Sequence, residues 1–218
     1  MLKNLAIVSG LLAAGLTLAG PADTHPTAPA ASADPLLVLQ ALPDLPESVA
    51  GNRVFLAASS CGVERWSIKT GTDAAAKSIN LAAAKPVSIA SLRSLAKPTS
   101  YPNSRIGTVE KTVYQIDATL TKYKSESDGD LHLVLSDANG QTLIVEIPDP
   151  GCMGSSPWKA KATAARQTFL ARYTPTSSFK KTSKKVRITG VGFFDKLHGQ
   201  TGVAPNGIEL HAVTGLAF

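Results

Sequence analysis

The chain has 218 residues, and its 44% hydrophobic content is enough for the packed core of a single domain. The formal net charge of +6 favours a polyanion or a bacterial surface as partner, yet only 17% of the residues are charged and no long basic run occurs. Composition therefore does not indicate a dedicated polyanion binder. The densest basic group precedes a predicted strand and is interpreted as a solvated loop: Lys180, Lys181, Lys184, Lys185 and Arg187.

Residues 1–33 are predicted to be a signal peptide and spacer. Lys3 precedes an apolar run over residues 5–19, which is too short for a comfortable membrane span. Small residues that suit a signal peptidase occur at residues 31–33, with residues 20–22 as a competing cleavage site. We therefore expect a secreted protein, periplasmic or extracellular, whose mature part has no membrane span.

The chain has two cysteines, Cys61 and Cys152. In an exported protein a lone pair of cysteines favours a disulfide bond, which here joins the extension to the end of a predicted strand. The alternative is a nucleophilic Cys152 assisted by a histidine. No local motif supports that alternative, and it leaves Cys61 without a role.

Residues 34–109 are predicted to form an irregular and helical extension. Prolines interrupt the apolar stretch over residues 36–45, which favours an irregular arm. Residues 88–95 carry apolar side chains at helical spacing and predict a short helix. Residues 61–69 fit neither a helix nor a strand well, so no element is predicted there.

Residues 110–218 carry the pattern of a mainly β domain. Alternating apolar residues and turn signals predict five strands, and a helix that Ser156 caps between the third and fourth strands. The predicted strands cover residues 113–123, 130–137, 143–147, 186–194 and 208–213.

This order of elements resembles the oligonucleotide/oligosaccharide-binding fold, or OB-fold. The resemblance implies a five-stranded barrel with one helix, in which ligands meet strands 2 and 3 and two loops, here residues 124–130 and 195–207. The blocks DGDLHLVLSD, VEIPDPGC and HGQTGVAPNGIELHAV are also similar to those of a group of uncharacterised secreted bacterial proteins. That second resemblance implies no activity.

The two loops carry the candidate ligand-binding residues, which are Glu126, Asp128, Asp130, His198 and Asn206. The three carboxylates stand where a nucleic-acid binder needs basic and aromatic side chains. We therefore expect a glycan or a protein as ligand, and disfavour nucleic acid at this acidic face.

A metal site is the sharper hypothesis for the same region. Glu209 and His211 are two residues apart on the last predicted strand and therefore share a face. If that face meets the side chain of His132, the three residues can hold zinc, with Glu146 or His198 in reserve. The alternative is a set of solvated polar side chains on the outer face of a barrel.

Calcium is a weaker alternative to zinc. Glu126, Asp128 and Asp130 offer alternating oxygen ligands, but Leu131 stands where an EF-hand loop needs glycine. No other cofactor is predicted.

The sequence favours a secreted binding or interaction module over an enzyme. It has no Gly-x-Ser-x-Gly elbow, no phosphate-binding glycine loop and no His-Glu-x-x-His helix. Two other hypotheses stay open. One is a small metal-dependent hydrolase, acting on phosphoesters, with a site of histidines and carboxylates, and the other is a structural envelope protein.

Overall fold

The structure is a computed structural model, and it describes residues 60–218. The predictions for the signal peptide, the spacer and the first part of the extension lie outside the described residues. Within residues 60–218, no helix has the length and apolar character needed to cross a bilayer.

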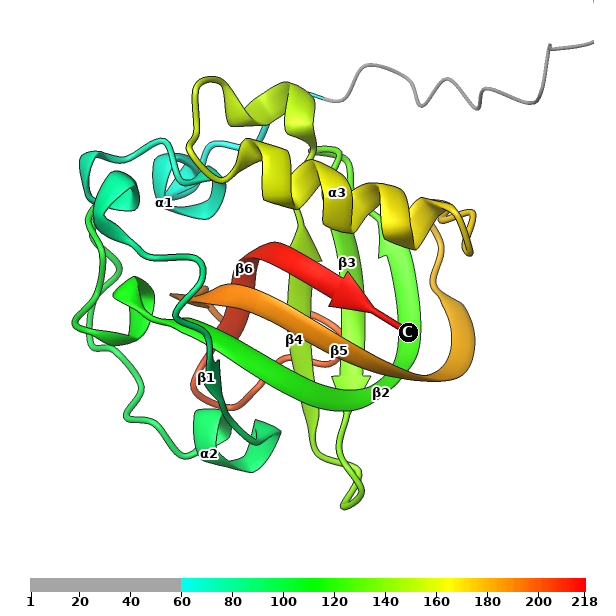
Figure 1. Ribbon diagram of the computed structural model, residues 1–218. Helices are drawn as coiled ribbons and strands as arrows, with labels where there is room; N and C mark the ends of the chain where they lie inside the picture. The colour runs from blue at the N-terminus through cyan, green and yellow to red at the C-terminus, as the bar shows by residue number, and fades with distance from the viewer. Residues whose placement is uncertain (1–59) are drawn as a thin grey trace, which may run out of the picture. The chain divides into compact units, whose positions relative to one another are not determined.

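Six strands form one sheet (Figure 1). The strands are β1 (Lys85–Pro86), β2 (Val113–Ser125), β3 (Leu131–Ser136), β4 (Thr142–Ile147), β5 (Lys180–Phe194) and β6 (Ile208–Ala217). Strand β2 pairs with β3 and β5, and the other long pairs are β3 with β4, β4 with β6, and β6 with β5. The pairing thus runs in a closed ring from β2 back to β2, and the short β1 joins β2 in parallel. The prediction of a mainly β chain is confirmed.

The core lies inside the ring of strands. In β2 the alternation predicted from the sequence is present, since Ile116, Ala118 and Leu120 are buried. Strands β3 and β4 are instead buried on both faces over most of their length, because loops and the extension cover the outer face. Polar residues of these strands are therefore largely shielded from water, and the alternative of a solvated outer face is wrong for them.

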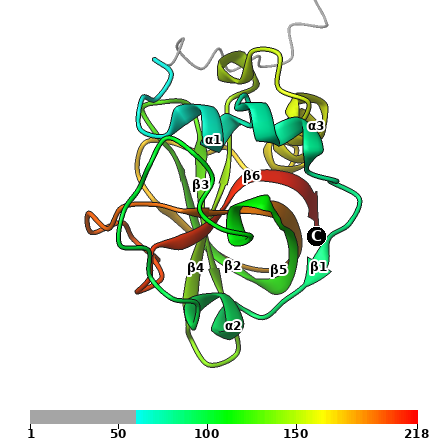
Figure 2. The same ribbon diagram turned by 90° about the vertical axis from the view of Figure 1, so that its left-hand side faces the viewer.

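The helices lie at the ends of this ring (Figures 1 and 2). They are α1 (Trp66–Thr70), α2 (Ile89–Arg93), α3 (Lys159–Leu170) and the 3-10 helices η3 (Ala74–Ser78), η4 (Val109–Lys111) and η5 (Pro150–Met153). Helix α3 packs against β6 at one end, and α2 lies at the other. The predicted helix in residues 88–95 is confirmed as α2, and Ser88 caps it by accepting the N–H of Ser91.

The predicted cap of the longest helix is wrong. The Oγ of Ser156 accepts the N–H of Trp158 and closes a turn, and α3 begins only at Lys159. Helix α3 nevertheless buries one apolar face, which includes Ala162, Ala165 and Phe169.

The basic group predicted as a loop belongs to a strand. Strand β5 begins at Lys180, and its basic half pairs with β2, for example Lys184 with Leu120 and Lys181 with Lys122. Backbone pairing does not require burial of the side chains. Lysines that stay exposed on the outer face are therefore compatible with a strand.

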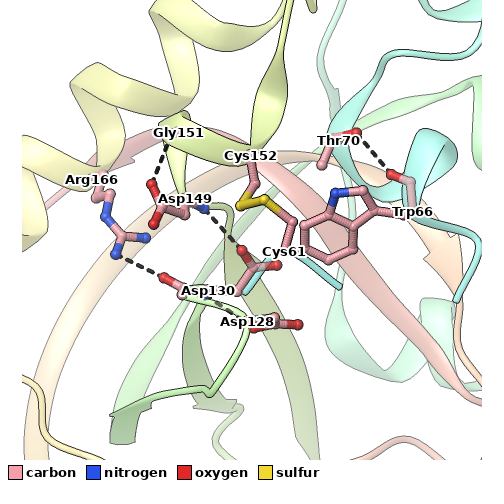
Figure 3. The surroundings of a disulfide bond; sticks show 10 residues. Cys61, Trp66, Thr70, Asp128, Asp130, Asp149, Gly151, Cys152 and Arg166 are labelled. Atoms are coloured by element: carbon pink, nitrogen blue, oxygen red, sulfur yellow. Dashed lines mark hydrogen bonds between the residues drawn. A yellow bond between two sulfur atoms is a disulfide. The ribbon is translucent and has the colours of Figure 1, made fainter. Parts of the chain in front are cut away.

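The predicted disulfide is confirmed between Cys61 and Cys152 (Figure 3). It ties the start of the described extension to η5, just after β4. The two cysteines are 91 residues apart in sequence. A loop of that length restricts the unfolded chain strongly, by about 4 to 5 kcal/mol in the chain-entropy description.

Candidate functional site

A pocket of about 370 Å³ opens between the loop that follows β2 and the loop that joins β5 to β6. These are the two loops in which the sequence predicts ligand contacts. The pocket is rich in ionisable side chains, which are Lys69, Lys124, Glu126, Asp128, His132, Glu146, Asp195, His198 and Glu209.

Strand register places the central residues of the pocket. His132 in β3 lies directly opposite Glu146 in β4. On the other side of β4, Ile144 is paired with Glu209 in β6, and the two strands are parallel. Two residues further along each strand, Glu146 and His211 therefore emerge on the same side of the sheet.

His132 faces two carboxylates and a backbone carbonyl. Its Nδ1 lies 3.0 Å from Oε1 of Glu146 and 3.3 Å from Oε1 of Glu126. Its Nε2 lies 3.1 Å from the carbonyl oxygen of Thr201. Because a carbonyl only accepts hydrogen bonds, Nε2 carries the proton in this contact and Nδ1 is left for the carboxylates.

His211 is fully buried and has carboxylates on both sides of its ring. Its Nδ1 lies 3.1 Å from Oε2 of Glu146 and 3.4 Å from Oε1 of Glu209. Its Nε2 lies 3.1 Å from Oδ2 of Asp130. This last contact has the distance of an ion pair but not the angles of a hydrogen bond, so both atoms are buried without a hydrogen-bond partner.

The two histidines are cationic in this environment when no metal is bound. Burial alone lowers the pKa of His132, but Glu126 and Glu146 outweigh it and raise this pKa to about 10. The pKa of His211 is likewise lowered by burial and raised well above its ordinary value by Asp130, Glu146 and Glu209.

The carboxyl groups of Glu146 and Glu209 are shifted in opposite directions. Burial raises the pKa of Glu146, but His132 and His211 hold it well below its ordinary value. Burial and the charge of Glu146 raise the pKa of Glu209 to about 7. Glu146 is therefore the anion of the centre, and Glu209 can gain or lose a proton near neutral pH.

The structure separates the predicted ligand-binding residues. Glu126, Asp128 and His198 line the pocket, and the side chain of His198 is 67% exposed. Asp130 is fully buried behind the pocket. Asn206 lies elsewhere, where its amide donates to the carbonyl oxygens of Leu92 and Leu95 and holds α2.

The predicted zinc ligands His132, Glu209 and His211 lie in one cluster. Glu209 contacts His211 directly, and Glu146 joins His211 to His132. Glu146, which the sequence suggested only as an additional zinc ligand, therefore lies at the centre of the cluster. All four residues are buried, so they do not form a solvated polar face.

Sequence reasoning missed Lys69 and the carbonyl of Thr201. Burial lowers the pKa of the Lys69 ammonium, but Glu209 and Glu146 together outweigh it and raise this pKa. No sequence pattern indicates this placement, because Lys69 comes from the segment in which no element is predicted.

Among residues 60–218, two groups of side chains have the geometry to hold a cation. They are Glu126, His132 and Glu146, and Asp130, Glu146 and His211. Within each group, one donor atom per residue lies within 4.8 Å of the others. The groups share Glu146. The carboxylates considered for calcium do not share a common contact. Glu126 pairs with Lys124, whereas Asp128 accepts the N–H of Asp130.

Comparison of the chain with models of known protein families gives no match, and comparison with curated protein sequences gives none either.

Proposed function

We propose that the protein is a secreted binding module on an OB-like barrel and that its acidic pocket holds a divalent metal cation. The closed ring of paired strands supports the barrel. So does the position of α3 in the chain between β4 and β5, which are the third and fourth ring strands in sequence order. The disulfide supports export, because such bonds persist in oxidising compartments.

The geometry of His132 carries the proposal. Metal-binding histidines usually donate their second ring N–H to a carbonyl or carboxylate, which fixes the ring and leaves the other nitrogen to ligate. The contact between Nε2 of His132 and the carbonyl of Thr201 has this form. Nδ1 then faces Glu146 and Glu126, which are oxygen ligands at the distances expected around one ion.

The donor atoms favour a borderline cation. One imidazole nitrogen and two carboxylate oxygens suit Zn²⁺ or Mn²⁺ better than Ca²⁺, which prefers an all-oxygen shell. No thiolate takes part, because both cysteines of the chain form the disulfide.

Titration calorimetry of chelator-treated protein with Zn²⁺, Mn²⁺ and Ca²⁺ tests this site. We expect Zn²⁺ or Mn²⁺ to bind, and His132→Asn to weaken binding by more than about 100-fold, since loss of a mere supporting partner costs 10- to 100-fold. His198→Asn is the matched control, because His198 lines the same pocket but is largely exposed. Folded wild-type protein that binds neither ion rejects the proposal, and so does equal weakening by both substitutions.

A metal-dependent hydrolase is the second candidate, and the pocket favours it. Three protein ligands leave a coordination position for water, as in catalytic zinc sites, and the pocket places Lys69 and Lys124 beside it. Their ammonium groups pair with Glu126 and Asp195, and when turned toward the pocket they suit an anionic substrate such as a phosphoester. Metal-loaded protein should then hydrolyse a chromogenic phosphodiester, and His132→Asn should abolish the activity. Absence of turnover with bound metal leaves the binding module as the function.

A further inference from the structure

We propose that Asp130, Glu146 and His211 bind a second cation, and that Glu146 bridges this cation to the one in the pocket. The inference rests on the proposed metal-binding function and goes beyond it, because the pocket group requires only a single ion. It assigns a two-cation centre to the covered outer face of the sheet.

Each oxygen of the Glu146 carboxylate contacts a different histidine. Its Oε1 lies 3.0 Å from Nδ1 of His132, and its Oε2 lies 3.1 Å from Nδ1 of His211. A carboxylate that turns one oxygen toward each of two histidine rings, and that belongs to both groups of candidate ligands, is placed to bridge two ions. In two-metal sites the ions lie about 3.5 to 4 Å apart, which one carboxylate can span.

Behind Glu146 lie two buried atoms that are able to bind a metal and that have no hydrogen-bond partner. Oδ2 of Asp130 and Nε2 of His211 are both fully buried and lie 3.1 Å apart without hydrogen-bond geometry. The two groups attract each other as charges, but no hydrogen bond completes the pair, which is uncommon for buried polar atoms. Ligands of a single ion approach each other to about this distance without bonding to one another, since each lies roughly 2.0 to 2.2 Å from the metal.

In this proposal His211 ligates through Nε2, the nitrogen that faces Asp130. Its Nδ1 is then free to donate its N–H to Glu209, which is not one of the proposed ligands. This is the outer support that metal-binding imidazoles need.

The backbone around Asp130 fixes its position before any ion binds. Its Oδ1 accepts the N–H of Asp149, which lies beside the disulfide (Figure 3). The guanidinium of Arg166 donates to the carbonyl oxygens of Gly129 and Ile147, one just before β3 and one at the end of β4. A site held in this way loses little conformational entropy on binding.

Metal content and electron paramagnetic resonance of Mn²⁺-loaded protein test the inference. We expect wild-type protein to bind two equivalents, and its spectrum to show two coupled ions in place of the hyperfine-split signal of an isolated Mn²⁺. Asp130→Asn, which keeps the shape of the side chain, should retain one equivalent with the isolated signal. His132→Asn should retain the buried equivalent, and Glu146→Gln should lose the coupling.

The outcomes separate this inference from the proposed function. A single equivalent in wild-type protein that survives Asp130→Asn overturns the second site and leaves the pocket cation in place. No bound metal in folded protein overturns both. The wild-type spectrum decides between one and two ions even if a buried substitution impairs folding. Asp117→Asn should keep both equivalents, because this exposed carboxylate belongs to neither group.

Discussion

The guanidinium of Arg65 forms a bidentate ion pair with the carboxylate of Glu110, with N–O distances of 2.9 and 2.7 Å. Both side chains are buried. Arg65 also donates to the carbonyl oxygen of Phe194 at the end of β5, and Glu110 accepts the N–H of the same residue. One ion pair thus joins the extension, the 3-10 helix η4 and the sheet.

Removal of the Glu110 carboxylate should destabilise the protein strongly. Glu110→Ala leaves the Arg65 guanidinium buried without its partner, and breaking a buried pair in this way costs about 3 to 5 kcal/mol. Urea unfolding measures the change. Asp117→Ala is the control, because the Asp117–Arg187 pair has similar bidentate geometry but is exposed, so its loss should have no measurable effect. Equal effects of the two substitutions contradict the role assigned to burial.

Cys61 and Cys152 should be bonded in the mature protein. Mass spectrometry after alkylation without reduction should find no modified thiol. Exchange of both cysteines for serine should lower the free energy of unfolding by at most about 4 to 5 kcal/mol, since the bond restricts the unfolded chain. Two alkylated thiols in the native protein contradict this pairing.

Glu209 should make the stability of metal-free protein fall as the pH rises. The pKa of Glu209 is about 7 in the folded protein against an ordinary value of 4.5. The folded state therefore binds this proton more tightly, so the contribution of Glu209 to stability is fully present below pH 4.5 and is lost as the pH rises through about 7.

Thermal melts from acid to neutral pH measure this dependence. Glu209→Gln replaces the carboxyl with a neutral amide and should flatten the decline, so that the variant melts higher than wild type above pH 7. Glu64→Gln is the control, because the Glu64 side chain is 43% exposed at the surface. Parallel curves for wild type and Glu209→Gln would falsify the assignment.

Zinc binding should release protons from His132. The pKa of its imidazole is about 10 without metal, so the ring is protonated at neutral pH, whereas only the neutral ring can ligate. Calorimetry near pH 7.5 in buffers of different ionisation enthalpy counts the protons. We expect His132 to release about one proton when zinc binds, and we expect this proton release to be absent in His132→Asn. Binding without proton release contradicts a metal-bound His132.

The basic half of β5 should account for any binding of nucleic acid. Lys181, Lys184 and Lys185 are exposed on this strand, away from the carboxylates that line the pocket. Such binding should be weak, independent of sequence and steeply reduced by salt. Replacing the three lysines with glutamine should abolish it in a filter-binding assay at low salt. Tight binding that survives high salt would place the nucleic-acid face elsewhere.

The sequence predicted the elements that depend on local pattern. Alternation indicated β2, β3, β4 and the cores of β5 and β6, and helical spacing indicated α2 and α3. The sequence-based prediction failed where the intrinsic preference of the residues differs from the pairing that the partner strand imposes. Lysines disfavour a strand by themselves, but the partner strand β2 extends β5 back to Lys180.

The chemistry of the pocket was only partly accessible from the sequence. Period-two alternation correctly put Glu209 and His211 on one face, and the lone cysteine pair indicated the disulfide. Alternation fixes the side of a strand on which a residue lies, but it fixes neither its neighbours nor its burial. Those depend on the register between β3, β4 and β6 and on the loops that cover them, which join residues far apart in the chain. Only the tertiary structure could therefore place Glu146 between His132 and His211, and Lys69 beside them.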